Sequence, residues 1–262
     1  LGYLQRCEAT CTHIESLGWM TMKGRRQLLR LSYWGKIVKM DKRRWVWKVY
    51  EEGRRRLESN ARANTWCSLT RKWMLELGLG AEWDAQEATG DWQARVRAAI
   101  TELEQRQWRE RIARRPKLDF YARWKKTIAR EEYLESKNST TRRLWTKMRT
   151  GCLELRIETG RWIRVSVQGR QVPVPRELRL CQLCGAETED AEHLLLRCPA
   201  YERERRTLVQ SGQRAGINQS ANPAEWWKWI FGGGGGEVAR QLLYKCMQKR
   251  KRLLEGMGVQ CK

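Results

Sequence analysis

Apolar side chains in the first half of the chain recur every three or four residues, which is the spacing of an α-helix with one buried face. Four stripes share this spacing: Leu28, Leu31, Trp34 and Val38; Trp66, Leu69, Trp73 and Leu77; Trp92, Val96, Ile100 and Leu103; Leu118, Tyr121, Trp124 and Ile128. Gly78–Gly80 and Thr89–Asp91 separate the stripes, and Pro116 ends the third. We interpret the stripes as core, although single tryptophans could instead be platforms on which bases stack.

The pattern changes to an alternation of apolar and polar residues after residue 150. Leu155 and Ile157 begin it, and Ile163, Val165 and Val167 continue it beyond Thr159–Gly160. Alternation around a glycine turn predicts a β-hairpin, which the prolines at 173 and 175 would end.

The remaining pattern predicts a helix containing Tyr201 to Leu208, then a polar linker from Ser211 to Asn222. An apolar patch, Trp226–Phe231, precedes the five glycines Gly232–Gly236, whose composition is typical of a flexible hinge. A last amphipathic helix carries Leu242, Leu243, Cys246 and Leu253. The expected fold class is mainly α: a basic tryptophan-rich helical region (1–150), a hairpin with a proline-containing lead-in (151–177), a small Cys/His knuckle with its following helix (178–210), and a linker, tryptophan patch, hinge and C-terminal helix (211–262).

Charge points to a polyanionic partner. The 262 residues include 53 Lys and Arg against 30 Asp and Glu, a net charge of +23. Such an excess favours RNA or DNA, with an anionic membrane surface or merely solvated helix faces as alternatives. No apolar run approaches the ~20 residues that cross a bilayer. The candidate phosphate-binding residues, chosen from the densest basic stretch, are Arg25, Arg26, Lys42, Arg43, Arg44, Arg54, Arg55 and Arg56.

The cysteines indicate a reducing compartment. Nine cysteines are spread along a chain in which no secretory signal is evident, which is unlike a disulfide framework. We expect a protein that is not secreted. The run Lys249–Arg252 is similar to a nuclear-localisation signal, so the location is nuclear or else cytoplasmic, although a solvated helix end explains the run equally well.

One constellation has the spacing of a metal site. Two residues separate Cys181 from Cys184, and His193 and Cys198 follow after eight and then four further residues. A C-x2-C pair turns both thiols toward one point, and Gly185 tolerates the positive φ that such a knuckle favours. Three thiolates and one imidazole predict one structural zinc, since no ligand position is left for water. His193 and Cys198 are expected in the first turns of the following helix.

The other cysteines predict no site. Cys7, Cys11 and His13 lack an evident fourth ligand, so ordinary packing is expected for them. Cys67, Cys152 and Cys246 lie on apolar stripes and are expected to pack as small hydrophobes.

Around this constellation the chain resembles the C-terminal region of non-LTR (LINE-type) retrotransposon reverse transcriptases. The resemblance rests on Arg149–Gly151, Leu153–Arg161 and Pro175–Cys181, and continues through Cys184, Glu189-Asp190, Glu192–Leu195, Cys198-Pro199, Tyr201 and Arg205. Upstream, Leu31, Tyr33-Trp34, Lys36-Ile37, Met40 and Arg43-Arg44 resemble the segment after the polymerase thumb, so the resemblance covers most of residues 1–206.

The resemblance implies a zinc-binding tail whose ligands are Cys181, Cys184, His193 and Cys198, and which grips template RNA or target DNA beside the polymerase palm of a parent protein. It implies no small-molecule substrate. The palm's paired aspartates have no counterpart, and neither do the carboxylate cores of the nucleases that some relatives carry. We therefore expect no catalytic centre in this chain. The alternatives are a zinc-containing adaptor that binds protein and a decayed element fragment without activity.

Overall fold

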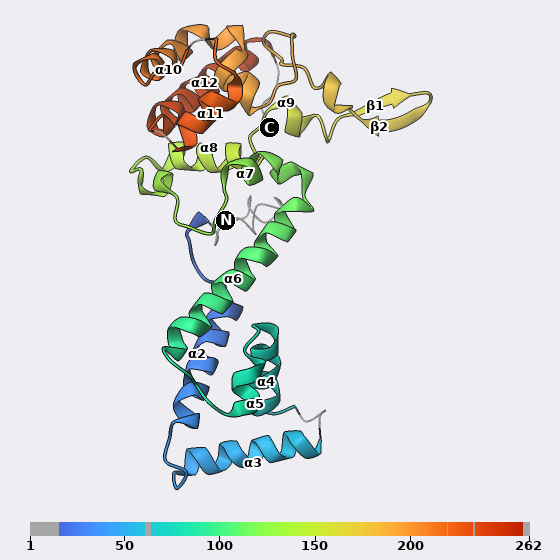
Figure 1. Cartoon of the computed structure of the whole chain (residues 1–262). Helices are drawn as coiled ribbons and strands as arrows, with labels where there is room; N and C mark the ends of the chain where they lie inside the picture. The colour runs from blue at the N-terminus through green and yellow to red at the C-terminus, as the bar shows by residue number, and fades with distance from the viewer. Residues whose placement is uncertain (1–15, 61–63, 219, 233, 259–262) are drawn as a thin grey trace. The chain divides into compact units, whose positions relative to one another are not determined.

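The protein is mainly helical, with one two-stranded antiparallel sheet, as expected from the sequence (Figure 1). The computed structural model describes residues 16–60, 64–218, 220–232 and 234–258. These residues form two compact units: unit 2 spans 18–114, and unit 1 contains the described residues before 18 and after 114. None of the helices in these ranges is long and apolar enough to cross a membrane.

The described residues of unit 2 form five helices: α2 (Met22–Val38), α3 (Trp45–Ser59), α4 (Trp66–Glu76), α5 (Gly80–Ala85) and α6 (Trp92–Ala113). Local sequence explains where three of them begin, because side chains accept the first free amide groups. Thr21 caps α2, Thr65 and Ser68 form a reciprocal capping box on α4, and Asp91 caps α6. The unit ends at Arg114, within the region expected to be one helical domain.

Tryptophans form the centre of the unit 2 core. The fully buried Trp34 stacks on Trp83 with ring centroids 6.2 Å apart, and packs against Trp92 at 5.0 Å. The indole N–H of Trp34 donates to the Tyr50 hydroxyl at 2.9 Å, and that of Trp92 donates to the Leu31 carbonyl at 2.7 Å. Leu31, Val96 and Ile100 surround them. These stripe residues are therefore core, as predicted.

Unit 1 contains the remaining elements. Its α-helices are α7 (Asp119–Trp124), α8 (Ser139–Arg149), α9 (Arg156–Thr159), α10 (Glu202–Arg214), α11 (Pro223–Gly232) and α12 (Gly236–Gly256). Short turns of 3-10 helix are η1 (Pro116–Leu118), η2 (Glu132–Glu135), η3 (Arg176–Leu178) and η5 (Pro199–Tyr201), and η4 (His193–Arg197) is one turn of π-helix. Its strands are β1 (Arg164–Val167) and β2 (Arg170–Pro173). Helices α8, α10 and α12 pack together around one core, to which Trp145, Leu208 and Leu243 belong.

The hairpin exists, but the predicted position was wrong. Leu155–Thr159 is not its first strand, because Arg156–Thr159 forms the short helix α9. Instead β1 pairs with β2 around Gln168 and Gly169, which both have positive φ, at 50° and 77°. Two consecutive left-handed residues make the turn whose twist matches paired strands. Gln-Gly is a weaker sequence signal for this turn than Asn-Gly.

Three other boundaries differ from expectation. Helix α7 ends at Trp124, so Ile128 lies outside it, and α10 extends over Ser211–Arg214, the first third of the predicted linker. The first and last glycines of the run belong to helices, because α11 ends at Gly232 and α12 begins at Gly236. A Cβ added at Gly235 would lie 2.6 Å from the Trp229 ring, so this close approach requires glycine. Packing against Trp229 therefore explains the glycine at position 235.

Candidate metal centre

The four predicted ligands come together in unit 1 and form the Cys/His cluster: Cys181, Cys184, His193 and Cys198. Their ligand atoms all lie within 4.8 Å of one another. The Cys181 and Cys198 sulfurs are 3.9 Å apart, and the Cys184 sulfur is 3.3 Å from His193 Nε2. Cys198 and His193 are almost completely buried, whereas Cys184 is partly exposed. The cluster can hold one metal ion.

The local chain folds into the expected knuckle. The Gly185 amide donates to the Cys181 carbonyl at 2.9 Å, and Gly185 has φ of +68°, as its position predicted. The other two ligands do not come from the first turns of the long helix. His193 begins the π-turn η4, whose first amide donates to the Asp190 carboxylate at 2.8 Å, and Cys198 follows the turn directly. The wide π-turn places His193 and Cys198 on the same side, facing the knuckle.

Backbone amides surround the three sulfurs. Burial raises the pKa of the Cys181 thiol, although the amides of Leu183 and Cys184 oppose that shift. Burial also raises the pKa of Cys198 to about 12, opposed by the Ala200 amide. At Cys184, burial would raise the pKa, but the Ala186 and Glu187 amides and the neighbouring thiols bring it below its usual value. Amide donors that point at sulfur favour the thiolate, which is the form that binds metal.

The donor set and spacing fit a tetrahedral ion. Zinc binds sulfur at about 2.3 Å and imidazole nitrogen at about 2.0 Å, so ligand atoms in a tetrahedral site lie about 3.5–3.8 Å apart. The sulfur–nitrogen distance of 3.3 Å and the sulfur–sulfur distance of 3.9 Å each lie within about 0.2 Å of that range. Three sulfurs and one nitrogen match zinc better than calcium or magnesium, which prefer oxygen. Within the described residues, this is the only group of His, Cys, Asp and Glu with such an arrangement.

Polar side chains outside the cluster fix its imidazole. The Glu187 carboxylate lies 3.2 Å from His193 Nδ1, leaving Nε2 directed at the cluster. Arg197 in turn lies 2.9 Å from Glu187 and 2.9 Å from Glu192. A carboxylate behind a ligating imidazole sets its tautomer and orientation in many metal sites. Glu187 could not be predicted from the sequence, because its position six residues before His193 has no characteristic spacing.

A buried ion pair attaches the C-terminal helix to the cluster region. Glu189 is completely buried, and both of its oxygens accept from the Arg250 guanidinium at 2.8 Å. Glu189 also accepts from the Arg156 amide at 2.8 Å, and Arg250 donates to Gln182 within the knuckle at 2.9 Å. This pair joins α12 to the knuckle over 61 residues of sequence. No sequence signal could have found it.

The same contact changes the interpretation of the basic run Lys249–Arg252. Arg250 is only 5 % exposed and is held by Glu189, and Lys249 pairs with Glu204 at 3.0 Å. Two of the four basic side chains therefore hold unit 1 together. The run is a structural part of α12, which weakens its similarity to a solvent-exposed localisation signal.

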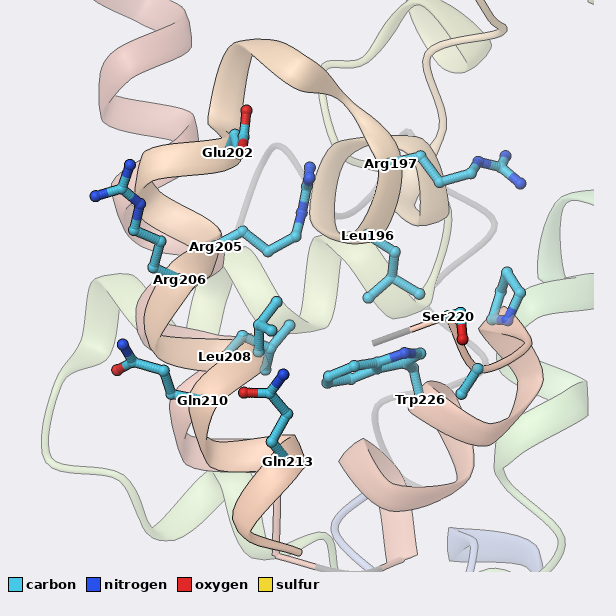
Figure 2. Close-up of a pocket in the computed structure, with 13 residues that line it drawn as sticks. Leu196, Arg197, Glu202, Arg205, Arg206, Leu208, Gln210, Gln213, Ser220 and Trp226 are labelled. Atoms are coloured by element: carbon cyan, nitrogen blue, oxygen red, sulfur yellow. The ribbon is translucent and has the colours of Figure 1, made fainter. Parts of the chain in front are cut away.

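A cavity of about 610 Å³ lies between η4, α10 and the start of α11 (Figure 2). Figure 2 shows Leu208 and Arg205 on one side and Trp226 on the other. Arg205 is not free to bind a ligand there, because its guanidinium donates to the Leu195 carbonyl at 2.8 Å and the Cys198 carbonyl at 2.6 Å. It thereby ties α10 to the chain around the fourth ligand.

The eight candidate phosphate-binding residues all lie in unit 2 and do not form one free basic surface. Arg54 pairs with Glu51 at 2.9 Å and Glu58 at 2.7 Å, and Arg55 and Arg56 both reach Glu52. The other five are exposed on α2 and around the start of α3: Arg25, Arg26, Lys42, Arg43 and Arg44. Arg43 lies 3.3 Å from Asp41. The triplet at 54–56 is therefore largely neutralised by its own helix.

The other cysteines are thiols in apolar surroundings where the structure describes them. Cys67, Cys152 and Cys246 are buried, as predicted. Burial raises the pKa of Cys67 to about 11 and that of Cys246 to about 12, which makes thiolate chemistry unfavourable. Cys7, Cys11 and His13, for which ordinary packing was predicted, lie outside the described residues.

Comparison with known proteins adds no relative: no family model, no curated protein and no solved structure matches this chain.

Proposed function

We propose that this chain is a nucleic-acid-binding C-terminal part of a retrotransposon reverse transcriptase of the non-LTR type, containing one structural zinc. Its role is to grip template RNA or target DNA while a polymerase palm carries out synthesis. The observation that carries the proposal is the Cys/His cluster, which brings together three sulfurs and one imidazole that is held by the Glu187 carboxylate. The cluster lies in the segment that resembles that family. The net charge of +23 supports a polyanionic partner.

The proposal includes no catalytic centre in this chain. Two-metal phosphoryl chemistry needs carboxylates that hold ions about 4 Å apart. Cations hold the adjacent glutamates considered for this role: the arginines at 54–56 pair with Glu51 and Glu52, and Lys125 and Arg149 pair with Glu131, the first member of Glu131–Glu132. Burial would raise the pKa of Glu131, but Arg149 and Lys125 bring it below its ordinary value. These contacts support a structural role for the acids.

Metal analysis tests the zinc. Purified protein is expected to carry one zinc per chain, and Cys184→Ser is expected to lose it, because a hydroxyl is a poor replacement for a thiolate ligand. Cys246→Ser is the matched control: that thiol is also buried, but lies outside the cluster. Equal zinc in the wild type and in Cys184→Ser would contradict the assignment.

Filter binding at several salt concentrations tests the nucleic-acid role. Each neutralised phosphate contributes about −0.7 (single strand) to −0.9 (duplex) to the slope of log K against log salt. If about 6–10 basic side chains engage, the affinity falls about 10³–10⁵-fold between 50 and 200 mM salt. A flat response would favour the protein-binding adaptor instead, and the absence of binding to RNA, DNA and protein would favour a decayed fragment.

A further inference from the structure

The hairpin β1–β2 is a two-stranded ribbon whose faces are largely unpacked. None of its eight strand residues is buried, and only Val165 and Val172 are partly covered. Figure 1 shows the ribbon extending away from the helices of unit 1. A lone hairpin is marginally stable in water. A ribbon that contributes so little to the core is free to contact another molecule.

The register separates the side chains onto two chemically different faces. Arg164 pairs with Pro173 and Ser166 pairs with Gln171, so these four lie on one face. Val165, Val172, Val167 and Arg170 lie on the other. The first face, called here the polar face, presents a guanidinium, a hydroxyl and a carboxamide, and all of its residues are exposed.

Charge around the ribbon fits a polyanion. From Arg161 to Arg176 the sequence contains four arginines and no acidic residue. Arg161 pairs with Glu158 at 3.2 Å, but Arg164, Arg170 and Arg176 are exposed and form no ion pair with any described residue. This differs from α3, where the arginines at 54–56 are paired with glutamates on the same helix.

We propose that the ribbon binds duplex DNA by entering the major groove with its polar face toward the base edges. The major groove of B-form DNA is about 12 Å wide and admits a two-stranded β-ribbon. Arginine, glutamine and serine are the side chains that hydrogen-bond guanine, adenine and either base there. The major groove of A-form RNA is too deep and narrow for side chains to read. Arg170 and Arg176 contact flanking phosphates.

This inference rests on the proposed nucleic-acid role and names a site for it. The test compares two variants of the full chain. The polar-face variant is Arg164→Ala, Ser166→Ala and Gln171→Ala, and the control is Arg170→Ala, which removes the same charge from the opposite face. Both keep the turn at Gln168–Gly169, and circular dichroism and zinc content check that both remain folded.

The probes are a 30-base-pair DNA duplex of mixed sequence and an RNA duplex of the same sequence. The polar-face variant should lose about tenfold more affinity for the DNA duplex than the control loses, as expected for the loss of base-edge hydrogen bonds. The two variants should be equal on the RNA duplex. The wild type, but not the polar-face variant, should protect guanine N7 from methylation by dimethyl sulfate, because N7 lies in the major groove.

The outcomes separate the two proposals. If the wild type binds neither duplex nor a single strand, the proposed nucleic-acid role is wrong and this inference falls with it. If the wild type binds nucleic acid with the expected salt dependence but the polar-face variant matches the control on DNA, only the groove assignment is overturned. Equal losses on DNA and RNA duplexes, or unchanged N7 protection, overturn it as well, because the arginines would then contact phosphates alone.

Discussion

The two units are both helical and aromatic-rich, but they bury different kinds of side chain. Among the described residues, the buried polar side chains of unit 2 are Gln27 and Thr70, both uncharged. Unit 1 buries ionisable ones: Lys125, Arg149, Glu189, His193 and Arg250. Unit 2 is held by the packing of tryptophans, whereas unit 1 also depends on specific polar contacts.

The difference indicates where precise geometry matters. A buried charge loses its hydration, and an ion pair recovers that loss only with good geometry and full hydrogen bonding. Glu189 and Arg250 meet this condition with a bidentate contact. Apolar packing is less directional and tolerates more exchange. Unit 1 therefore positions the Cys/His cluster, while unit 2 is a helical unit that needs only a packed core.

Removing the metal should produce the largest difference between the two units. Structural zinc in comparable peptides contributes about 10–16 kcal/mol of apparent binding free energy. Chelation, or Cys184→Ser, should expose the amides around Cys181–Cys198 and loosen α12 through Arg250, while α2 and α6 keep their protection. Hydrogen exchange read by mass spectrometry measures both units at once. Equal loss of protection in unit 2 would show that the two units do not fold independently.

The next largest effect should come from Arg250→Met. It leaves the buried Glu189 carboxylate without its cation, which costs about 3–5 kcal/mol of unfolding free energy for a broken buried pair. Arg252→Met, two residues along α12 at an exposed position, is the control and should change stability by less than about 0.5 kcal/mol. Urea unfolding followed by near-ultraviolet circular dichroism measures both. Equal stabilities of the two variants would refute a structural role for the ion pair.

Overpacking should affect unit 2 alone. A Cβ at Gly35 would lie 2.2 Å from the Trp92 ring, whose position is fixed by its bond to Leu31. Gly35→Ala should therefore cost about 1–3 kcal/mol of unfolding free energy. Ser32→Ala on the same helix should be neutral or stabilising, because the buried Ser32 hydroxyl has no hydrogen-bond partner among the residues that the structure describes. Tryptophan fluorescence and zinc content, measured together, should show unit 2 weakened and zinc retained.

The smallest expected effect is a difference in salt dependence between the arginines in and beside the hairpin and the arginines at 54–56. Replacing Arg164, Arg170 and Arg176 by glutamine should lower the magnitude of the salt slope by up to about 1.8, because Arg170 and Arg176 each release one phosphate contact worth about 0.9 on duplex DNA, whereas Arg164 faces the base edges. Replacing Arg54, Arg55 and Arg56 should lower it by less, since glutamates already neutralise them. Salt titrations of both variants on one DNA duplex measure this. A larger change for the 54–56 variant would reverse the ranking.

Sequence by itself determined the features that depend on local spacing. The helical stripes placed Leu31, Trp34 and Val96 in a core, because a period of 3.6 residues keeps one face together wherever that face packs. Cysteines separated by two residues brought Cys181 and Cys184 together, since a knuckle is closed by hydrogen bonds within five residues. The scarcity of histidine then identified His193 as the third ligand.

Tertiary structure decided what depends on distant neighbours. The hairpin is formed by β1 and β2 and does not include Leu155, because Leu155 is buried in the unit 1 core and the residues after it form the helix α9. Arg250 became a buried partner of Glu189 although it lies in a run of four basic residues. The number of basic side chains can be counted in the sequence, but which of them remain free depends on the acidic side chains that folding brings near them. For the same reason the arginine triplet at 54–56 is less available than Arg164 and Arg170 on the hairpin and Arg176 just after it.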